Sequence, residues 1–248
     1  DVCSSDLLAG LTNYVEEHGC DIGIATDGDA DRLGVIDDKA EFLHPNKILV
    51  LLYYYLMRYR GWRGAAVRNL ATTHLLDRIA EDFGETCYEV PVGFKYVSAK
   101  MVETGAIIGG ESSGGLTVRG HIQGKDGIYA AALLVEAIAK TGRRLSALWD
   151  EITQKYGAAE MAEHDFHFSS AERTRIFKLL MEDKQLPEFP CEIAKVSYMD
   201  GCKVYFKNGG WVIARFSGTE PLLRVFCERD TMENAEKVAK ILTEFLSL

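Results

Sequence analysis

The chain has 248 residues, of which 47% are hydrophobic and 26% charged, so it can bury a sizeable core and favours more than one domain. Its formal net charge of −9 argues against a nucleic-acid-binding surface, which needs a basic patch, and its longest apolar run, residues 48–57, is too short to span a membrane. Six cysteines without a CxxC pair indicate neither a zinc site nor a disulfide framework, which predicts reduced thiols and a cytoplasmic protein.

The first predicted elements are a helix and two strands, and the strands are joined by an acidic loop. Residues 5–18 place leucine, tyrosine and valine side chains on one helical face, and Gly19 can end this helix. Apolar runs at 22–25 and 33–36 flank three aspartates at alternating positions. This order predicts a strand, a tight loop and a second strand.

The loop between these strands is the first candidate site. Its aspartates are Asp27, Asp29 and Asp31, separated by Gly28 and Ala30, whose small side chains let the backbone curl and turn the carboxylates toward one point. Three such carboxylates repel one another unless a cation lies between them. Hard oxygen ligands in a compact loop favour Mg²⁺. The sequence therefore predicts a magnesium site here.

The acidic loop also fits a polar turn or a phosphatase site, but not an EF-hand. A polar turn between strands is often rich in Asp and Gly, and a phosphatase with an aspartyl nucleophile can also carry aspartates after a strand. An EF-hand needs glycine at its sixth position and glutamate at its twelfth, where this sequence has Arg32 and Asp38. The EF-hand is therefore excluded, and the turn and the phosphatase stay open.

The segment Asp-Gly-Asp-Ala-Asp-Arg after a buried strand resembles the metal-binding loop of the α-D-phosphohexomutases, the superfamily of phosphoglucomutases and phosphomannomutases. The resemblance implies that Asp27, Asp29 and Asp31 bind Mg²⁺. It also implies that Arg32 is a catalytic residue. A permanent cation directly after the last aspartate fits that role, because it can meet a phosphoryl group.

The middle of the chain alternates between strands and helices. Such alternation implies an α/β domain with a mixed, largely parallel sheet and helices on both faces. Ligands of these sheets bind at the loops beyond the carboxyl ends of the strands. In chain order, we expect a buried helix at 48–57, a strand at 65–70, a helix at 73–83, a strand at 87–90, a helix at 96–104, a strand at 106–108 and helices at 126–140 and 145–156.

The glycine-rich segment 109–115 is the second candidate site. Its four glycines let the backbone approach a ligand, and one carboxylate and two hydroxyls suit the vicinal hydroxyls of a sugar. A flexible glycine loop accounts for the spacing equally well. The segment is similar to the family's sugar-specificity loop, which implies that Glu111 and Ser113 bind sugar hydroxyls. Gly115 departs from the family pattern, since some phosphomannomutase-type members carry a histidine at this position.

Two shorter segments also resemble the family. Val-Gly-Phe-Lys, ending at Lys95, matches a segment at the catalytic cleft, which implies a catalytic role in phosphate contact or proton movement. A solvated lysine at the start of a helix is the alternative. Lys125 and Asp126 match a substrate-binding pattern at the start of a helix, whose N-terminus favours anions. Asp126 can also be a simple N-cap.

After residue 158 the pattern changes to that of a smaller α+β domain. We expect a strand, a helix at 171–182, a proline-bearing link, four strands in succession and a closing helix at 232–246. Turns at 200–201 and 208–210 predict hairpins.

The third candidate site follows the strand at 211–216. Arg-Phe-Ser-Gly-Thr-Glu-Pro with a further arginine nearby offers backbone N–H groups, two hydroxyls and two guanidinium groups, which suit a dianionic phosphate without a metal. A hairpin with an incidental arginine is the alternative. The stretch resembles the family's C-terminal phosphate-binding loop, which implies substrate contacts by Arg215, Ser217, Gly218, Thr219 and Arg224.

The three motifs occur in the family's order. The resemblance implies an enzyme that moves a phosphoryl group between O1 and O6 of a hexose phosphate through a hexose bisphosphate, with a phosphoserine donor in a Ser-His-Asn-Pro type motif. This sequence has no such motif and opens at Asp1 without methionine, so we expect the C-terminal part of such an enzyme, inactive without its N-terminal half. A non-catalytic sugar-phosphate-binding module is the alternative.

Three domains are expected from this resemblance. Residues 1–40 would be the end of an α/β domain carrying the metal loop, 41–157 an α/β domain carrying the sugar-binding loop, and 158–248 an α+β domain carrying the phosphate-binding loop. The expected partners are hexose phosphates and bisphosphates, with glucose and mannose both open, and neither nucleic acid nor membrane.

Overall fold

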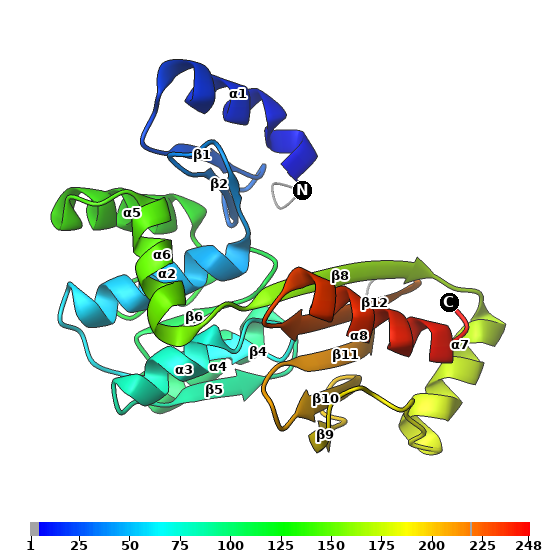
Figure 1. Cartoon of the computed structure of the whole chain (residues 1–248). Coiled ribbons are helices and arrows are strands. Elements are labelled where there is room, and N and C mark those ends of the chain that lie inside the picture. Colours follow the sequence, from blue (N-terminus) through cyan, green and yellow to red (C-terminus); the bar gives the residue numbers. More distant parts are fainter. Residues whose placement is uncertain (1–4, 219) are drawn as a thin grey trace. The chain divides into compact units, whose positions relative to one another are not determined.

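The computed structural model describes residues 5–218 and 220–248, so the expected phosphate ligand Thr219 lies outside the described residues, as does Cys3. Contacts between Cα atoms divide the chain after Gly157 into two compact units, each with its own sheets (Figure 1). The predicted further division at residue 40 stays a prediction. The five cysteines among the described residues are free thiols. Within the same residues, no helix has both the length and the apolar character that crossing a membrane requires.

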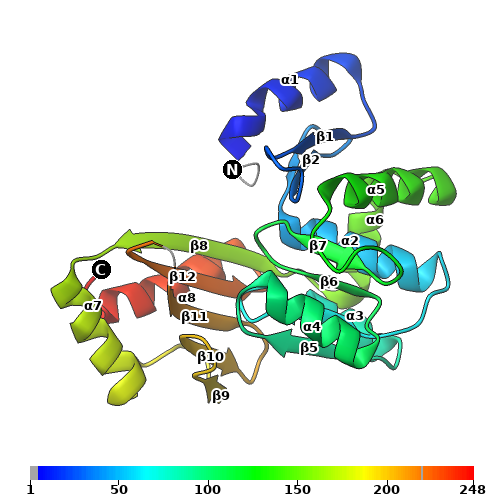
Figure 2. The same ribbon diagram turned by 180° about the vertical axis from the view of Figure 1, so that it is seen from behind.

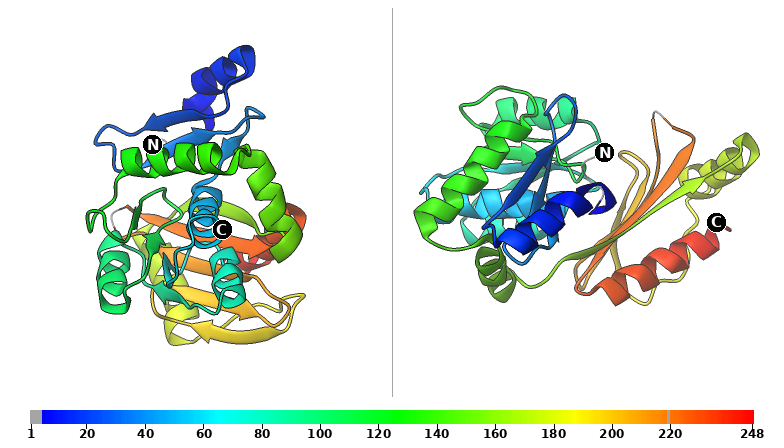
Figure 3. Two further views of the ribbon diagram at one scale, coloured as in Figure 1. Left: turned by 90° about the vertical axis from the view of Figure 1, so that its left-hand side faces the viewer. Right: turned by 90° about the horizontal axis from the view of Figure 1, so that it is seen from above.

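The first unit opens with a helix packed on a small antiparallel sheet, whose strand order is β1-β2-β3. Val15 of the helix and Ile36 of the sheet share a small core, and Figure 3 shows α1 lying beside these strands. The helix ends at Gly19, whose φ of 60° is left-handed and suits glycine. The predicted strand, loop and strand are confirmed. The elements are the 3₁₀ turn η1 (Ser5–Leu8), α1 (Ala9–His18), β1 (Gly23–Thr26), β2 (Leu33–Ile36) and β3 (Phe42–Leu43).

A second, four-stranded sheet of this unit has the order β5-β4-β6-β7. Strands β5, β6 and β7 of this sheet are labelled in Figure 2. Strand β4 runs parallel to β5 and β6, and β7 runs antiparallel to β6. The elements are α2 (Pro45–Arg58), β4 (Ala66–Asn69), α3 (Leu75–Asp82), β5 (Cys87–Val90), α4 (Phe94–Thr104), β6 (Ile108–Gly110), β7 (Leu116–Val118), α5 (Gly127–Thr141) and α6 (Leu145–Tyr156).

Helices pack directly on both faces of this sheet because β6 carries two glycines. A Cβ atom at Gly109 would lie 2.4 Å from Sδ of Met101 in α4, whereas one at Gly110 would lie 2.8 Å from a methyl group of Leu49 in α2. Consecutive strand residues face opposite sides, so α4 and α2 cover opposite faces. The predicted α/β sheet, largely parallel and covered on both faces, is confirmed.

Strand β7 was not predicted, and β6 ends two residues later than expected. Leu116–Val118 is only three residues long and follows the glycine-rich turn directly, so the apolar pattern is too short to indicate a strand. Its pairing with β6 supplies what the local sequence lacks. The two glycines at 109 and 110 belong to the sheet and not to the loop.

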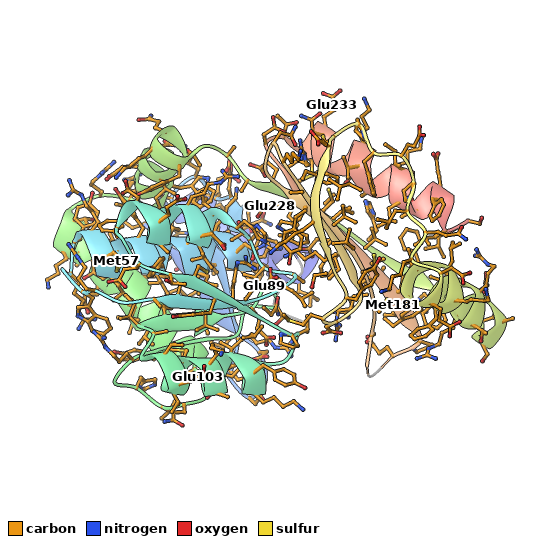
Figure 4. All side chains as sticks on the ribbon, turned by 90° about the horizontal axis from the view of Figure 1, so that it is seen from below. Met57, Glu89, Glu103, Met181, Glu228 and Glu233 are labelled. Carbon is orange, nitrogen blue, oxygen red and sulfur yellow. The ribbon has the colours of Figure 1, made fainter. Side chains whose placement is uncertain are left out.

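A buried ion network ties β4 to its neighbours. Arg68 is 2% exposed and donates to both carboxylate oxygens of Asp77, at 2.7 and 2.9 Å, and to Glu89 at 2.6 Å. Glu89, on β5, is labelled in Figure 4. Burial alone would raise the pKa of Asp77, but the guanidinium of Arg68 outweighs it and lowers that pKa.

The second unit is an antiparallel sheet with the order β8-β12-β11-β10-β9 and helices on one core. Val204, Val212, Val225 and Val238 belong to that core, and Figure 3 shows α8 lying along the strands. The predicted α+β domain with hairpins is confirmed, although the end of its first helix is a π-helix. The elements are β8 (Glu160–His167), α7 (Ser170–Phe177), the π-helix η2 (Lys178–Glu182), β9 (Ile193–Ser197), β10 (Cys202–Phe206), β11 (Trp211–Phe216), β12 (Leu222–Arg229) and α8 (Met232–Phe245).

Candidate functional site

The acidic loop between β1 and β2 brings its three carboxylates together. One oxygen atom from each of Asp27, Asp29 and Asp31 lies within 4.8 Å of the other two. Asp29 is exposed, and the other two are half-buried. The loop therefore presents a compact group of hard oxygen ligands that is open to solvent on one side.

Backbone constraints hold this loop in shape. Ala30 has a φ of 57°, a left-handed conformation that is costly for any residue with a Cβ atom. Its carbonyl oxygen accepts a hydrogen bond of 2.9 Å from the backbone N–H of Gly127, at the start of α5. A Cβ atom at Gly127 would lie 2.7 Å from the carbonyl oxygen of Arg32. Glycine is thus required at 127, where the helix approaches the loop.

Two cations flank the carboxylates. The Arg32 Nε atom lies 3.5 Å from Asp31 and 3.9 Å from Asp27, and the ammonium group of Lys125 pairs with the other oxygen of Asp31. Within residues 5–218 and 220–248, the buried Arg32 Nε–H makes no hydrogen bond. Positive charge is thus placed beside the carboxylates, with one donor unused.

The geometry fits Mg²⁺. An octahedral Mg²⁺ binds oxygen at about 2.0–2.1 Å, so its ligand atoms lie about 2.9 to 4.2 Å apart. The separations of up to 4.8 Å between the three carboxylates come within a small adjustment of that range. The exposed side of Asp29 leaves room for water or a phosphate oxygen to complete the coordination.

Neighbouring segments hold the carboxylate of the sugar loop (residues 109–115) in place. Glu111 is 7% exposed, and its Oε1 atom accepts hydrogen bonds from Asn69 Nδ2 at 2.9 Å and from the backbone N–H of Gly93 at 2.8 Å. Ser113 is exposed at the tip of the turn. Sequence reasoning missed Asn69, although a lone amide at the end of an apolar strand was the available signal.

Lys95 lies in the same neighbourhood, at the first turn of α4. Its side chain is exposed, and its ammonium group lies 4.9 Å from the centre of the Tyr96 ring. Because Gly93 immediately before this helix donates to Glu111, the structure brings the Lys95 segment and the sugar loop together.

Gly115 connects the sugar loop to the metal loop. A Cβ atom at Gly115 would lie 2.2 Å from Cδ of Lys125, so the lysine's aliphatic chain crosses this glycine before its ammonium group reaches Asp31. The turn is closed by the Glu111 backbone N–H, which donates to the Gly115 carbonyl at 3.0 Å. A continuous series of contacts, here called the track, therefore runs from the carboxylates through Lys125 and Gly115 to Glu111.

Asp126 caps helix α5. Its Oδ1 atom accepts the backbone N–H of Tyr129 at 2.8 Å, and its Oδ2 atom contacts His121 Nε2 at 2.7 Å. These two contacts lower the pKa of Asp126, the Tyr129 N–H most and the His121 ring next. His121, which the sequence reasoning did not single out, also stacks on Tyr129 at 3.9 Å. Both carboxylate oxygens of Asp126 are engaged within the chain, so the capping interpretation holds.

In the second unit, the two arginines of the predicted phosphate loop lie opposite each other. Arg215 of β11 and Arg224 of β12 are directly paired in the antiparallel register, which places their Cβ atoms roughly 5 Å apart. Like charges in such a pair destabilise a sheet. Acidic side chains offset part of this: Arg215 Nε donates to Asp200 at 2.9 Å, and Arg224 pairs with Asp165 at 3.6 Å and Glu220 at 3.5 Å.

The turn between these strands is closed by its own hydrogen bonds. The Ser217 backbone N–H donates to Leu222 at 2.8 Å, and its hydroxyl oxygen accepts the Glu220 N–H at 3.3 Å. Nothing lies within 4 Å of a Cβ atom built on Gly218, so the turn is open there. The buried Nε–H of Arg224 makes no hydrogen bond within the described ranges. Two guanidinium groups beside an open turn can receive an anion.

Three domain models of one family match consecutive parts of the chain. They are those for phosphoglucomutase/phosphomannomutase α/β/α domain II at residues 4–40, α/β/α domain III at 44–156 and the C-terminal domain at 177–245. The chain belongs to the α-D-phosphohexomutase superfamily. The matches follow the order in which the metal, sugar and phosphate motifs occur.

Relatives of this superfamily match along nearly the whole chain. A phosphoglucomutase/phosphomannomutase of Thermococcus kodakarensis is 33% identical over 234 residues, which is 94% of this chain and 49% of the relative. A phosphoglucosamine mutase of Acetivibrio thermocellus is 30% identical over 249 residues, covering 98% of this chain and 52% of the relative. The chain thus spans about half the length of these curated relatives.

Solved structures of the superfamily share the fold. A phosphoglucomutase/phosphomannomutase family protein of Burkholderia thailandensis matches with a TM-score of 0.80 and 23% identity, over 100% of this chain and 51% of that one. An N-acetylphosphoglucosamine mutase of Aspergillus fumigatus, solved with GlcNAc-6P and magnesium, matches with a TM-score of 0.58 and 16% identity, over 94% and 55%.

Proposed function

We propose that this chain is the metal-, sugar- and phosphate-binding part of a phosphohexomutase that transfers a phosphoryl group between O1 and O6 of a hexose phosphate through a hexose bisphosphate. The observation that carries this proposal is the continuous track from the three aspartates through Lys125 and Gly115 to Glu111. A sugar phosphate needs a cation for its reacting phosphoryl group and an acceptor for its hydroxyls, and the track offers both.

In this proposal Asp27, Asp29 and Asp31 hold Mg²⁺, which when bound would offset negative charge on the phosphoryl group. The Arg32 side chain is 38% exposed beside these carboxylates, so its guanidinium group is suited to meet an oxygen of that group. Lys125 lies between the carboxylates and the sugar loop, where it can contact the substrate once it leaves Asp31. Lys95, at the exposed start of α4, can contact phosphate or move a proton.

Glu111 and Ser113 would bind the sugar hydroxyls, whereas Arg215, Ser217, Gly218, Thr219 and Arg224 would hold the phosphate that is not transferred. The sugar must turn over between the two half-reactions, so the same hydroxyl and phosphate sites have to accept both orientations. Asp126 would act mainly by capping α5 beside Lys125.

The phosphoryl donor is proposed to lie outside these 248 residues. The Ser-Ser pairs at 4–5, 112–113 and 169–170 are not followed by His and Asn, and the sequence has no Ser-His-Asn-Pro type motif. The matched relatives are about twice as long as this chain. The N-terminal half of such an enzyme is therefore the expected partner.

A reconstitution assay tests the proposal. The chain is assayed alone and mixed with the N-terminal half of a related mutase, using glucose 1-phosphate, mannose 1-phosphate and glucosamine 1-phosphate. We expect no turnover alone, because phosphoryl transfer needs a donor in line with the sugar, and turnover of at least one sugar phosphate in the mixture. Turnover by the chain alone would disprove the external donor.

The same assay separates the second candidate, a non-catalytic sugar-phosphate-binding module. This candidate is supported by the absence of a donor-serine motif. It predicts sugar-phosphate binding by calorimetry without turnover, even in the fused full-length protein. Fusion controls for weak association of the two halves.

A further inference from the structure

A buried hydrogen-bond network lies beneath the sugar loop, and none of its side chains was assigned a role above except Glu111. Asn69, at the end of β4, is 2% exposed, Thr72 is fully buried, and Glu111 is 7% exposed. Asn69 Nδ2 donates to Glu111, while the Thr72 hydroxyl donates to Asn69 and accepts the backbone N–H of Ser112 at 3.0 Å. The network thus reaches both the carboxylate and the backbone of the turn.

The orientation of the Asn69 amide is fixed by its partners. Its Oδ1 atom accepts the backbone N–H of Ala71 at 2.9 Å and the hydroxyl of Thr72 at 2.8 Å. An amide turned the other way would face the Ala71 N–H with its own N–H groups. Nδ2 must therefore point to Glu111, as a donor only.

The two oxygens of Glu111 consequently have different surroundings. Oε1 receives both donors, from Asn69 at 2.9 Å and from Gly93 at 2.8 Å. Among the described residues, none donates a hydrogen bond to Oε2. This atom also keeps some exposure to solvent. Oε2 is therefore the oxygen that solvent or a ligand can reach.

We infer that Asn69 is a positioning residue for sugar recognition: it fixes Glu111 with Oε1 inward and Oε2 directed to a hexose hydroxyl. This inference rests on the proposed role of Glu111 as the hydroxyl-binding residue. A free glutamate loses rotamer freedom on binding, whereas one already held by two donors loses little. Asn69 thereby controls affinity for the sugar without touching it, and leaves affinity for the phosphate alone unchanged.

The test uses the 248-residue chain and two probes, glucose 1-phosphate and inorganic phosphate, measured by calorimetric or NMR titration. Asn69→Asp keeps the Oδ1 acceptor and the volume but replaces the donor with a carboxylate oxygen facing Oε1. We expect glucose 1-phosphate to bind about tenfold more weakly, the loss of one charge-assisted hydrogen bond, and inorganic phosphate to bind as in the wild type. Gln154→Glu, at an exposed position of α6, makes the same charge change and is expected to alter neither.

A double-mutant cycle with Glu111→Ala distinguishes the possible failures. If Asn69 acts through Glu111, Asn69→Asp adds nothing in the Glu111→Ala background. If Glu111→Ala weakens glucose 1-phosphate but Asn69→Asp does not, the positioning role is wrong and the proposed role of Glu111 survives. If Glu111→Ala binds glucose 1-phosphate like the wild type, the proposed sugar site fails, and the inference with it. Asn69→Ser, measured alongside, replaces Asn69→Asp if the buried charge lowers the unfolding temperature strongly.

Discussion

The metal loop of the first unit and the hairpin of β11 and β12 in the second unit concentrate charge of opposite sign. They do so by different means. In the loop, alternating positions in one short segment carry three carboxylates within 4.8 Å of one another. In the hairpin, the antiparallel register of β11 and β12 sets Arg215 opposite Arg224. One cluster is made by local sequence, the other by strand pairing.

The two clusters share a further property. Each is partly neutralised by flanking charges, Arg32 and Lys125 for the loop, and Asp165, Asp200 and Glu220 for the hairpin. In each, an arginine Nε–H is buried without a hydrogen bond in the described part of the chain, at Arg32 and at Arg224. Both nitrogen atoms face a carboxylate, that of Asp31 at 3.5 Å and that of Asp165 at 3.6 Å. In the proposed function, the loop would bind a cation and then a phosphoryl oxygen, whereas the hairpin would bind an anion directly.

The largest expected effect is the loss of Mg²⁺ affinity when a carboxylate of the metal loop is removed. Asp29→Ala, or Asp31→Ala, should lower Mg²⁺ affinity by about a hundredfold or more, because two carboxylates hold a hard divalent cation poorly. Calorimetric titration with Mg²⁺ measures it, and Asp21→Ala, an exposed aspartate before β1, is the control. Unchanged Mg²⁺ affinity in both loop variants would contradict the metal assignment.

The next largest effect is weaker phosphate binding when an arginine of the β11–β12 hairpin is removed. Arg215→Ala should weaken glucose 1-phosphate and inorganic phosphate alike by about 1.5–3 kcal/mol, on the order of tenfold to a hundredfold, through loss of a charge-assisted bond. Mg²⁺ affinity should stay as in the wild type. In the reconstituted enzyme, KM should rise more than kcat falls, since this phosphate is held in ground and transition states alike.

Arg173→Ala is the matched control for that measurement. Arg173 lies over the ring of Phe216, next to Arg215, but does not belong to the arginine pair. It should bind both ligands like the wild type. If Arg215→Ala also does so while unfolding at the wild-type temperature, the hairpin is not the phosphate site.

A smaller effect of opposite sign, tighter Mg²⁺ binding, is expected at the metal loop. Lys125→Met removes the ammonium group that pairs with Asp31, so Mg²⁺ should bind about threefold to tenfold more tightly. Glucose 1-phosphate should bind more weakly in the same variant. Lys100→Met, which removes a lysine paired with Glu103 on α4, controls for the charge change. Weaker Mg²⁺ binding in Lys125→Met would show that the lysine supports the loop rather than competes with the metal.

The smallest effect concerns acid stability beside the loop. The pKa of Asp126 is lowered in the folded chain, so its carboxylate stabilises the fold at pH values above its unfolded pKa of about 3.8. That contribution is lost as the pH falls through the lower folded value. Asp126→Asn keeps an N-cap without a titrating charge and should flatten the loss of unfolding temperature below pH 4. An unchanged acid profile would contradict the linkage.

Local patterns indicated where the three carboxylates and the two arginines gather, because each group lies in a short stretch of sequence. Asp27, Asp29 and Asp31 lie within five positions, and the strands around them are plain in the apolar pattern. Contacts of high sequence separation were not predictable in this way. The hydrogen bond from Gly127 to Ala30 and that from Asn69 to Glu111 depend on how sheets and helices pack. Strand β7 was missed for the same reason, since its pairing rather than its composition makes it a strand.

Because glycine has no side chain, position 115 leaves room for the chain of Lys125. The aliphatic part of Lys125 occupies the space that a Cβ atom at 115 would need, at 2.2 Å. Any side chain at 115 therefore requires the aliphatic part of Lys125 to move aside. Positions 115 and 125 are thus coupled: a side chain at 115 displaces the lysine chain and, with it, the ammonium group that pairs with Asp31.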